Sequence, residues 1–155
     1  MSELNGFFSL RTTQDLVAKL AFDFQRLAAT EPTDRLAHYA AYDFFVCALH
    51  LADWASAATG RTLASLRSYP DGALVSHIAN GAKHFHVDVK RHTKARDTRT
   101  QRSGFQAGAF QLSAFQSAQL VVDLEDGSAV SVLDLAARVL RHWQDAVADE
   151  SSNDA

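Results

Sequence analysis

Apolar residues recur every three or four positions in four segments of the chain, the spacing of a helix with one buried face. The pattern predicts main helices from residue 12 or 13 to 29, from 34 to 58, from 73 to 85 and from 133 or 134 to 148, with a short helix or turn over 62–67. We expect Thr13 to cap the first helix, and Pro32 to follow its end because the residue before a proline leaves the helical region. Gly60 is expected to terminate the second helix, whose predicted core stripe comprises Leu36, Tyr39, Ala40, Phe44, Ala48, Leu51 and Ala55.

The segment between the third and last predicted helices lacks helical periodicity. Residues 88–103 are charged without an apolar repeat, which predicts a charged loop or a frayed helix end. After Gly104, Phe-Gln pairs recur every five residues, and we interpret this tract as one extended strand or a mobile flap. The next two apolar stretches, 119–124 and 128–133, flank an Asp-Gly turn sequence that is typical of a β-hairpin.

These elements predict a mainly α fold, an antiparallel bundle of about four helices with a small antiparallel β-hairpin before the C-terminal helix. The 155 residues suit one domain, 1–155. We expect loose termini over 1–10 and 149–155, and the extended tract and hairpin over 104–133.

Composition narrows the function classes only slightly. Hydrophobic residues make up 47% of the chain and ten are phenylalanine, which indicates a folded protein. The single cysteine, Cys47, excludes an internal disulfide and a multi-cysteine zinc site. No apolar run reaches membrane-spanning length and no secretory signal is visible, so we expect a cytoplasmic protein without a membrane partner. The net charge of -3 does not by itself indicate a nucleic-acid-binding protein.

Charge is nevertheless unevenly distributed along the chain. Between residues 83 and 102, Asp88 and Asp97 are outnumbered by the basic residues Lys83, Lys90, Arg91, Lys94, Arg96, Arg99 and Arg102. From Asp123 onward acidic residues dominate. This asymmetry indicates either an anionic partner for the middle of the chain or two regions that pair with each other, and a solvated loop and helix are the simpler alternative.

Two predicted helices carry polar residues along one side. The second helix carries Asp43, Cys47, His50 and Asp53, and the third carries His77, Asn80 and His84. If the two helices pack together, these stripes could meet in a pocket where carboxylates tune the imidazoles for acid–base work. The alternative is that the same groups face solvent or satisfy one another as buried hydrogen-bonding partners.

The most distinctive stretch is 78–86, where Gly81 lies within a predicted helix at a cost of roughly 1 kcal/mol relative to alanine. A glycine there indicates close approach of another helix or a ligand. Over about residues 35–86 the sequence resembles the HEPN superfamily of helical domains, whose motif is an arginine, a polar residue and then a histidine. Asn80 and His84 match the last two, and Ala79 stands where the arginine is expected.

The resemblance implies a homodimer that binds RNA or a nucleotide, either as a ribonuclease or as a degenerate relative that does not cleave. Asn80 and His84 would form the core of the site, with His50 and Asp53 setting the protonation of the histidine. The implied phosphate contacts come from Lys83, Lys90, Arg91 and Lys94. Ala79 puts cleavage in doubt, because a lysine nearby cannot reproduce the bidentate fork of an arginine.

Two other functions compete with this interpretation. A non-catalytic structural or interaction module would need the polar stripes only to satisfy one another. A metal-dependent enzyme would use His84 and His86 with His50, Asp53 and His77. Our expectation is that the site holds neither metal nor cofactor, since no metal-binding helix motif is present. Cys47 in mid-helix is typical of a small buried hydrophobe rather than a nucleophile.

Overall fold

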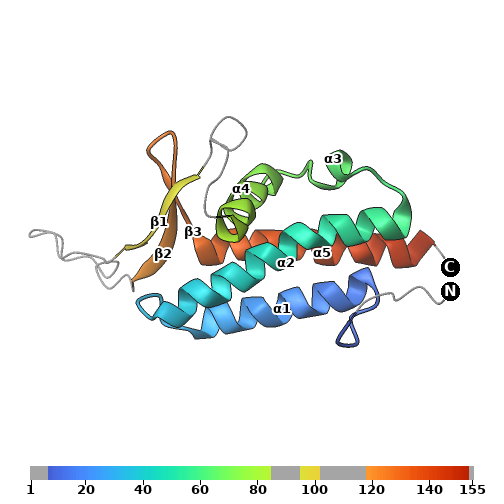
Figure 1. The fold of residues 1–155 in the computed structure, drawn as a ribbon, viewed down its shortest axis with the longest axis horizontal. Coiled ribbons are helices and arrows are strands. Elements are labelled where there is room, and N and C mark those ends of the chain that lie inside the picture. Colours follow the sequence, from blue (N-terminus) through green and yellow to red (C-terminus); the bar gives the residue numbers. More distant parts are fainter. Residues whose placement is uncertain (1–6, 85–94, 102–117, 154–155) are drawn as a thin grey trace, which may run out of the picture.

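The computed structural model describes residues 7–84, 95–101 and 118–153. Within these ranges the chain forms five helices and one antiparallel sheet (Figure 1). The elements in chain order are α1 (Thr13–Ala29), α2 (Arg35–Thr59), α3 (Leu63–Leu66), α4 (Gly72–Lys83), β1 (Ala95–Gln101), β2 (Gln119–Leu124), β3 (Ala129–Ser131) and α5 (Val132–Asn153).

The long helices α1, α2 and α5 lie side by side and enclose most of the core (Figure 1). α1 begins with a capping box, in which the Thr12 side chain accepts a hydrogen bond from the Asp15 amide and the Asp15 carboxylate accepts one from the Thr12 amide. The expected cap, Thr13, is instead the first helical residue and is buried. Thr12 takes the cap because the reciprocal partner stands three residues after it.

α2 confirms the longest predicted helix and its glycine stop. Gly60 adopts a left-handed conformation with φ of 73° and donates its amide to the Ser56 carbonyl, a conformation that glycine adopts without strain. The predicted core stripe is wrong at its N-terminal end, where Leu36 and Tyr39 are 58% and 52% exposed. The buried residue at this end is Ala37, which lies on the neighbouring side of the helix.

α4 crosses α2 and begins at a very close backbone contact. A Cβ atom on Gly72 would lie 2.0 Å from the Arg67 carbonyl oxygen, so only glycine fits the start of this helix. The helix ends at Lys83, two residues before the predicted end, and His84 is its C-cap. α5 begins at Val132 and continues to Asn153, beyond the predicted end at residue 148.

The sheet has the order β1-β2-β3 with both pairs antiparallel. β2 and β3 confirm the predicted hairpin. β1 corrects the prediction of a charged loop or helix end over 88–103, as far as the described residues 95–101 are concerned. Its own pattern carries no apolar alternation, and the strand forms because β2 supplies a ladder and Asp123 pairs with Arg99 at 2.8 Å.

The predicted fold class, a mainly helical bundle with a small antiparallel sheet before the last helix, is confirmed. The Phe-Gln tract, predicted to be a strand or flap, falls at 105–116 and lies outside the described residues. None of the described helices combines the length and the apolar character that crossing a bilayer requires.

Candidate functional site

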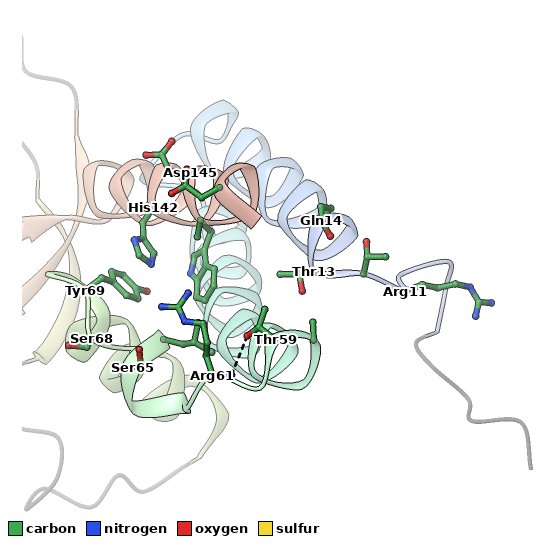
Figure 2. Close-up of a pocket in the computed structure, with 16 residues that line it drawn as sticks. Arg11, Thr13, Gln14, Thr59, Arg61, Ser65, Ser68, Tyr69, His142 and Asp145 are labelled. Carbon is green, nitrogen blue, oxygen red and sulfur yellow. Dashed lines mark hydrogen bonds between the residues drawn. The ribbon is translucent and has the colours of Figure 1, made fainter. Parts of the chain in front are cut away.

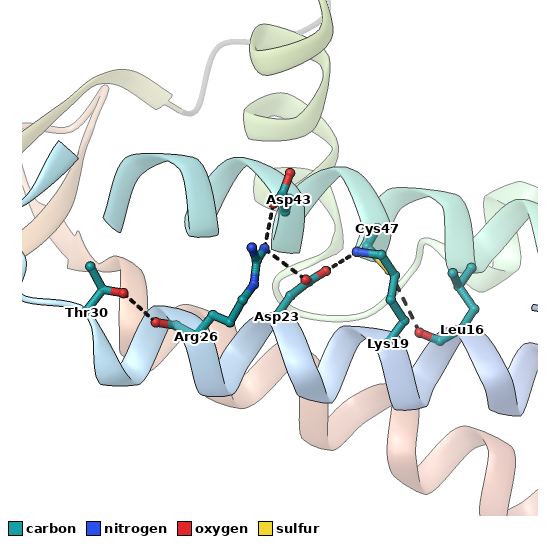
Figure 3. A network of polar contacts seen from close by, with 7 residues as sticks. All are labelled: Leu16, Lys19, Asp23, Arg26, Thr30, Asp43 and Cys47. Atoms are coloured by element: carbon teal, nitrogen blue, oxygen red, sulfur yellow. Dashed lines mark hydrogen bonds and ion pairs between the residues drawn. The ribbon is translucent and has the colours of Figure 1, made fainter. Parts of the chain in front are cut away.

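The polar stripe of α2 lies along its side toward α1. Asp43 pairs with Arg26 of α1 at 2.5 Å, and the buried Cys47 thiol points at the Leu16 carbonyl of α1, 3.8 Å away (Figure 3). Burial raises the pKa of this thiol to about 12. Cys47 is therefore protonated at neutral pH, which disqualifies it as a nucleophile.

Beneath this stripe lies a carboxylate that the sequence reading did not single out. The Asp23 side chain is 2% exposed and lies between Lys19, which contacts it one turn earlier, and Arg26, whose guanidinium lies 3.1 Å away (Figure 3). Arg26 thus bridges Asp23 of α1 and Asp43 of α2. The network ties the two helices together, and the pocket that Lys19 and Asp43 border is lined by residues before α1, of α1 and of α2.

His50 and Asp53 form the outer part of the stripe. The imidazole Nδ1 of His50 lies 3.5 Å from the Asp53 carboxylate, and both side chains are 43% exposed. Asp53 also pairs with Arg67, the C-cap of α3, at 3.1 Å. The structure therefore brings these two predicted residues together, and it joins them to α3 rather than to α4.

The three residues of the α4 stripe, His77, Asn80 and His84, differ in burial from the core to the end of the helix. His77 is buried, and its Nδ1 accepts a hydrogen bond of 2.9 Å from the Ala95 amide at the start of β1. Asn80 is half-buried, and its backbone carbonyl accepts a hydrogen bond from the backbone amide of His84. His84 is the C-terminal cap of the helix and is exposed. Lys83 is exposed beside it, whereas Lys90, Arg91 and Lys94 lie outside the described residues.

Within the described ranges, the two stripes do not face each other in the expected pocket. Successive helical residues turn by about 100°, so Cys47 and His50 point to one side of α2 while Ala48 and Ala52 point to the other. It is Ala48 and Ala52 that border Val75 of α4. Small residues allow the close crossing, and the ionisable ones face α1 and solvent. Across the described ranges, no three His, Cys, Asp or Glu residues are grouped so that they could hold a metal ion.

A groove of about 500 Å³ lies where α2, α4 and the sheet meet. Tyr42 and Phe45 of α2 and Ile78 of α4 supply apolar surface, Gly81 contributes backbone only, and Arg96 stands on the β1 side. His77 lies in its wall, and its bond to Ala95 fixes β1 against α4.

Of the residues that the sequence singles out on α4, His77 and Gly81 line this groove, whereas Asn80 and His84 do not. Tyr42 and Arg96 were not selected, because β1 was expected to be a loop and nothing local places it beside α2. The basic composition of residues 83–102 is the one sequence signal for Arg96, and Tyr42 has none.

Comparison with family models, with curated proteins and with solved structures finds no match for this chain. The function must therefore be argued from the groove and its surroundings.

Proposed function

We propose that this protein binds RNA, or a nucleotide unit of it, in the groove between α2, α4 and β1, and does so without cleaving it. The observation that carries the proposal is the position of two described basic residues, Lys83 and Arg96. α4 ends at Lys83 with His84 as its cap, Arg96 is the second residue of β1, and the hydrogen bond from Ala95 to His77 holds the start of β1 against α4 at one apolar groove.

The groove has the composition that a nucleobase requires. Its floor is apolar, and the half-exposed ring of Tyr42 stands at the surface beside it, where a base could stack. His38 adds a second exposed ring to the lining. Bases bound on aromatic rings in this way are held with little dependence on sequence, so we expect weak sequence preference.

Arg96 borders this floor together with the acidic Asp97, and Lys83 follows the lining residue Ala82 at the end of α4. Arg96 and Lys83 are exposed, and among the described residues neither is engaged in an ion pair. They are therefore available to contact phosphates, whereas Arg99 on the same strand is paired with Asp123. Phosphate contacts from lysine and arginine supply most of the affinity in binding of this kind.

Cleavage has less support than binding. Ala79 occupies the position of the motif arginine and is fully buried, so no guanidinium at that position could stabilise a scissile phosphate. Of the two residues expected to tune His84, His50 borders a pocket lined by α1 and α2, and Asp53 pairs with Arg67 after α3.

The binding proposal is tested by fluorescence anisotropy with a single-stranded RNA of about ten nucleotides. We expect affinity to fall steeply as salt rises, and Arg96→Glu to weaken it by about ten-fold or more. Tyr42→Ala should weaken it by about ten-fold through lost stacking. The matched controls are Arg141→Glu, an exposed arginine of α5, and Tyr39→Ala, an exposed tyrosine of α2 outside the groove.

Equal losses in the control variants, salt-independent binding or no binding would contradict the proposal. Incubation of labelled RNA with the wild type and with His84→Ala tests the claim that the protein does not cleave RNA. We expect the RNA to remain intact with both proteins, and degradation that His84→Ala abolishes would show that the protein is a nuclease. The expected homodimer and cytoplasmic location stay predictions, the first of which sedimentation velocity measures directly.

A further inference from the structure

A second and larger cavity lies at the other end of α2, remote from the groove. Its volume is about 970 Å³, and it is bordered by the start of α1, the end of α2, the loop through α3 and the second half of α5 (Figure 2). The residues on which the argument rests are Thr59, Arg61, Tyr69, His142, Trp143 and Asp145. The predicted RNA site uses none of them.

One wall of this cavity is a cluster of three rings. Tyr69 and His142 are stacked, with centroids 4.0 Å apart and planes at 13°, and Trp143 stands edge-on to both. Burial raises the pKa of Tyr69 to about 12 and lowers the pKa of His142, so the phenol and the imidazole are both uncharged at neutral pH. The wall is therefore an uncharged aromatic surface.

The wall also contains an unused hydrogen-bond donor. Trp143 is 1% exposed, and its indole Nε1 has no hydrogen-bond partner among the residues that the structure describes. It is close enough to the Tyr69 phenol to oppose, by a smaller amount, the rise in pKa that burial causes, but it is not in hydrogen-bond geometry. A buried donor without an acceptor is uncommon and costly. A ligand that supplies an acceptor, directly or by shifting Tyr69, would remove this cost.

Opposite charges flank the aromatic wall without pairing with each other. Figure 2 shows the Arg61 guanidinium extending from the loop after α2 toward the side of the cavity that Tyr69 and His142 form. Asp145 lies on α5 one turn after His142, and both charges act on the His142 imidazole. Within the described part of the chain, neither Arg61 nor Asp145 forms an ion pair.

We propose that this cavity binds a free α-amino acid with an apolar or aromatic side chain. Arg61 receives the carboxylate, Asp145 receives the ammonium group, and the side chain packs against the rings of Tyr69, His142 and Trp143. A ligand with only one charge would leave either Arg61 or Asp145 without a partner, whereas a zwitterion satisfies both. The hydroxyl groups along the border, such as that of Ser65, supply further polar contacts.

The proposal is tested by titrating the protein with L-phenylalanine and L-leucine while following the indole N–H resonance of Trp143, assigned with the variant Trp54→Phe. We expect a saturable shift for both with a Kd below about 1 mM. 3-Phenylpropionate lacks the ammonium group and phenethylamine lacks the carboxylate. Each should bind about ten-fold or more weakly than L-phenylalanine, because one charged contact is lost.

Two variants assign the charges separately. Arg61→Gln should weaken L-phenylalanine and 3-phenylpropionate by about ten-fold or more and leave phenethylamine unchanged. Asp145→Asn should weaken L-phenylalanine and phenethylamine and leave 3-phenylpropionate unchanged. Arg141→Gln, a neighbouring exposed arginine of α5 outside the cavity, is the matched control. The proposal is overturned if neither amino acid saturates the shift, if a singly charged analogue binds as tightly as L-phenylalanine, or if the variants act on all three probes alike.

Discussion

Asp23 shows why a charged side chain can lie in the core between α1 and α2. A buried carboxylate is costly unless cations and hydrogen bonds compensate for the lost hydration. Here Lys19 and Arg26 reach it from the same helix while their own side chains stay 39% and 41% exposed. The cations thus keep much of their hydration, and only the carboxylate is withdrawn from water. Asp43, the other partner of Arg26, is 43% exposed and contributes far less.

We expect Asp23→Asn to lower the free energy of unfolding by about 3 kcal/mol, since the amide keeps the shape and removes the charge that both cations need. Asp43→Asn, which breaks an exposed pair with the same Arg26, should cost less than about 1 kcal/mol. Urea unfolding followed by circular dichroism measures both. Equal effects of the two substitutions would show that burial of Asp23 adds nothing to this network.

At the scale of elements, what the sequence predicts depends on how local the signal is. The helices were predicted to within a few residues because periodicity, the Gly60 stop and the caps all act within one or two turns. β1 was not, because it is held by β2 and by the side chain of His77, which lies 18 residues before Ala95 in the chain. The polar stripe of α2 was found, but its rotation toward α1 depends on which alanines face α4, and periodicity alone does not determine that.

The bond from Ala95 to His77 makes β1 dependent on α4. His77→Leu places an apolar side chain of similar size in the wall. It removes the imidazole nitrogen that accepts the hydrogen bond from the Ala95 amide. We expect the stability of the protein to fall by about 1–3 kcal/mol and hydrogen exchange to accelerate in the amides of β1. His38→Leu, an exposed position lining the same groove, should change neither. Unchanged exchange in His77→Leu would mean that the ladder with β2 alone holds the strand.

At the scale of the whole molecule, α2 separates the two proposed sites. The groove uses its N-terminal half, and the cavity borders its C-terminal end at Ala58 and Thr59 and the following Arg61. A helix of 25 residues is about 37 Å long. The sites share none of their lining residues, so substitutions in one provide stability-matched controls for the other. The same core supports both sites. It contains two buried groups, the Cys47 thiol and the Tyr69 phenol, whose ionisation at high pH would lower the stability of the fold.

Cys47 between α1 and α2 and Tyr69 against α5 make the fold sensitive to alkali. Burial raises the pKa of Cys47 from 9.0 to about 12 and that of Tyr69 from 10.0 to about 12. Near pH 7 both groups are neutral whether the chain is folded or unfolded, so neither contributes a pH dependence there. Above pH 9 the unfolded thiol ionises and the folded one does not. Unfolding then releases a proton, and the free energy of unfolding falls by about 1.4 kcal/mol per pH unit for each such group.

We therefore expect wild-type stability to be nearly level between pH 7 and 8 and to decline as the pH rises through 9, where these groups begin to ionise in the unfolded chain. Between pH 8 and 10.5, Cys47→Ala should lose about 2 kcal/mol less than the wild type, because one of the two groups is gone. Tyr69→Phe should show a smaller benefit, since its ordinary pKa lies one unit higher. Urea unfolding at each pH measures these differences, with Tyr39→Phe as the exposed control. If Cys47→Ala loses as much stability as the wild type across this interval, the thiol ionises equally in the folded and unfolded chain, and burial does not raise its pKa.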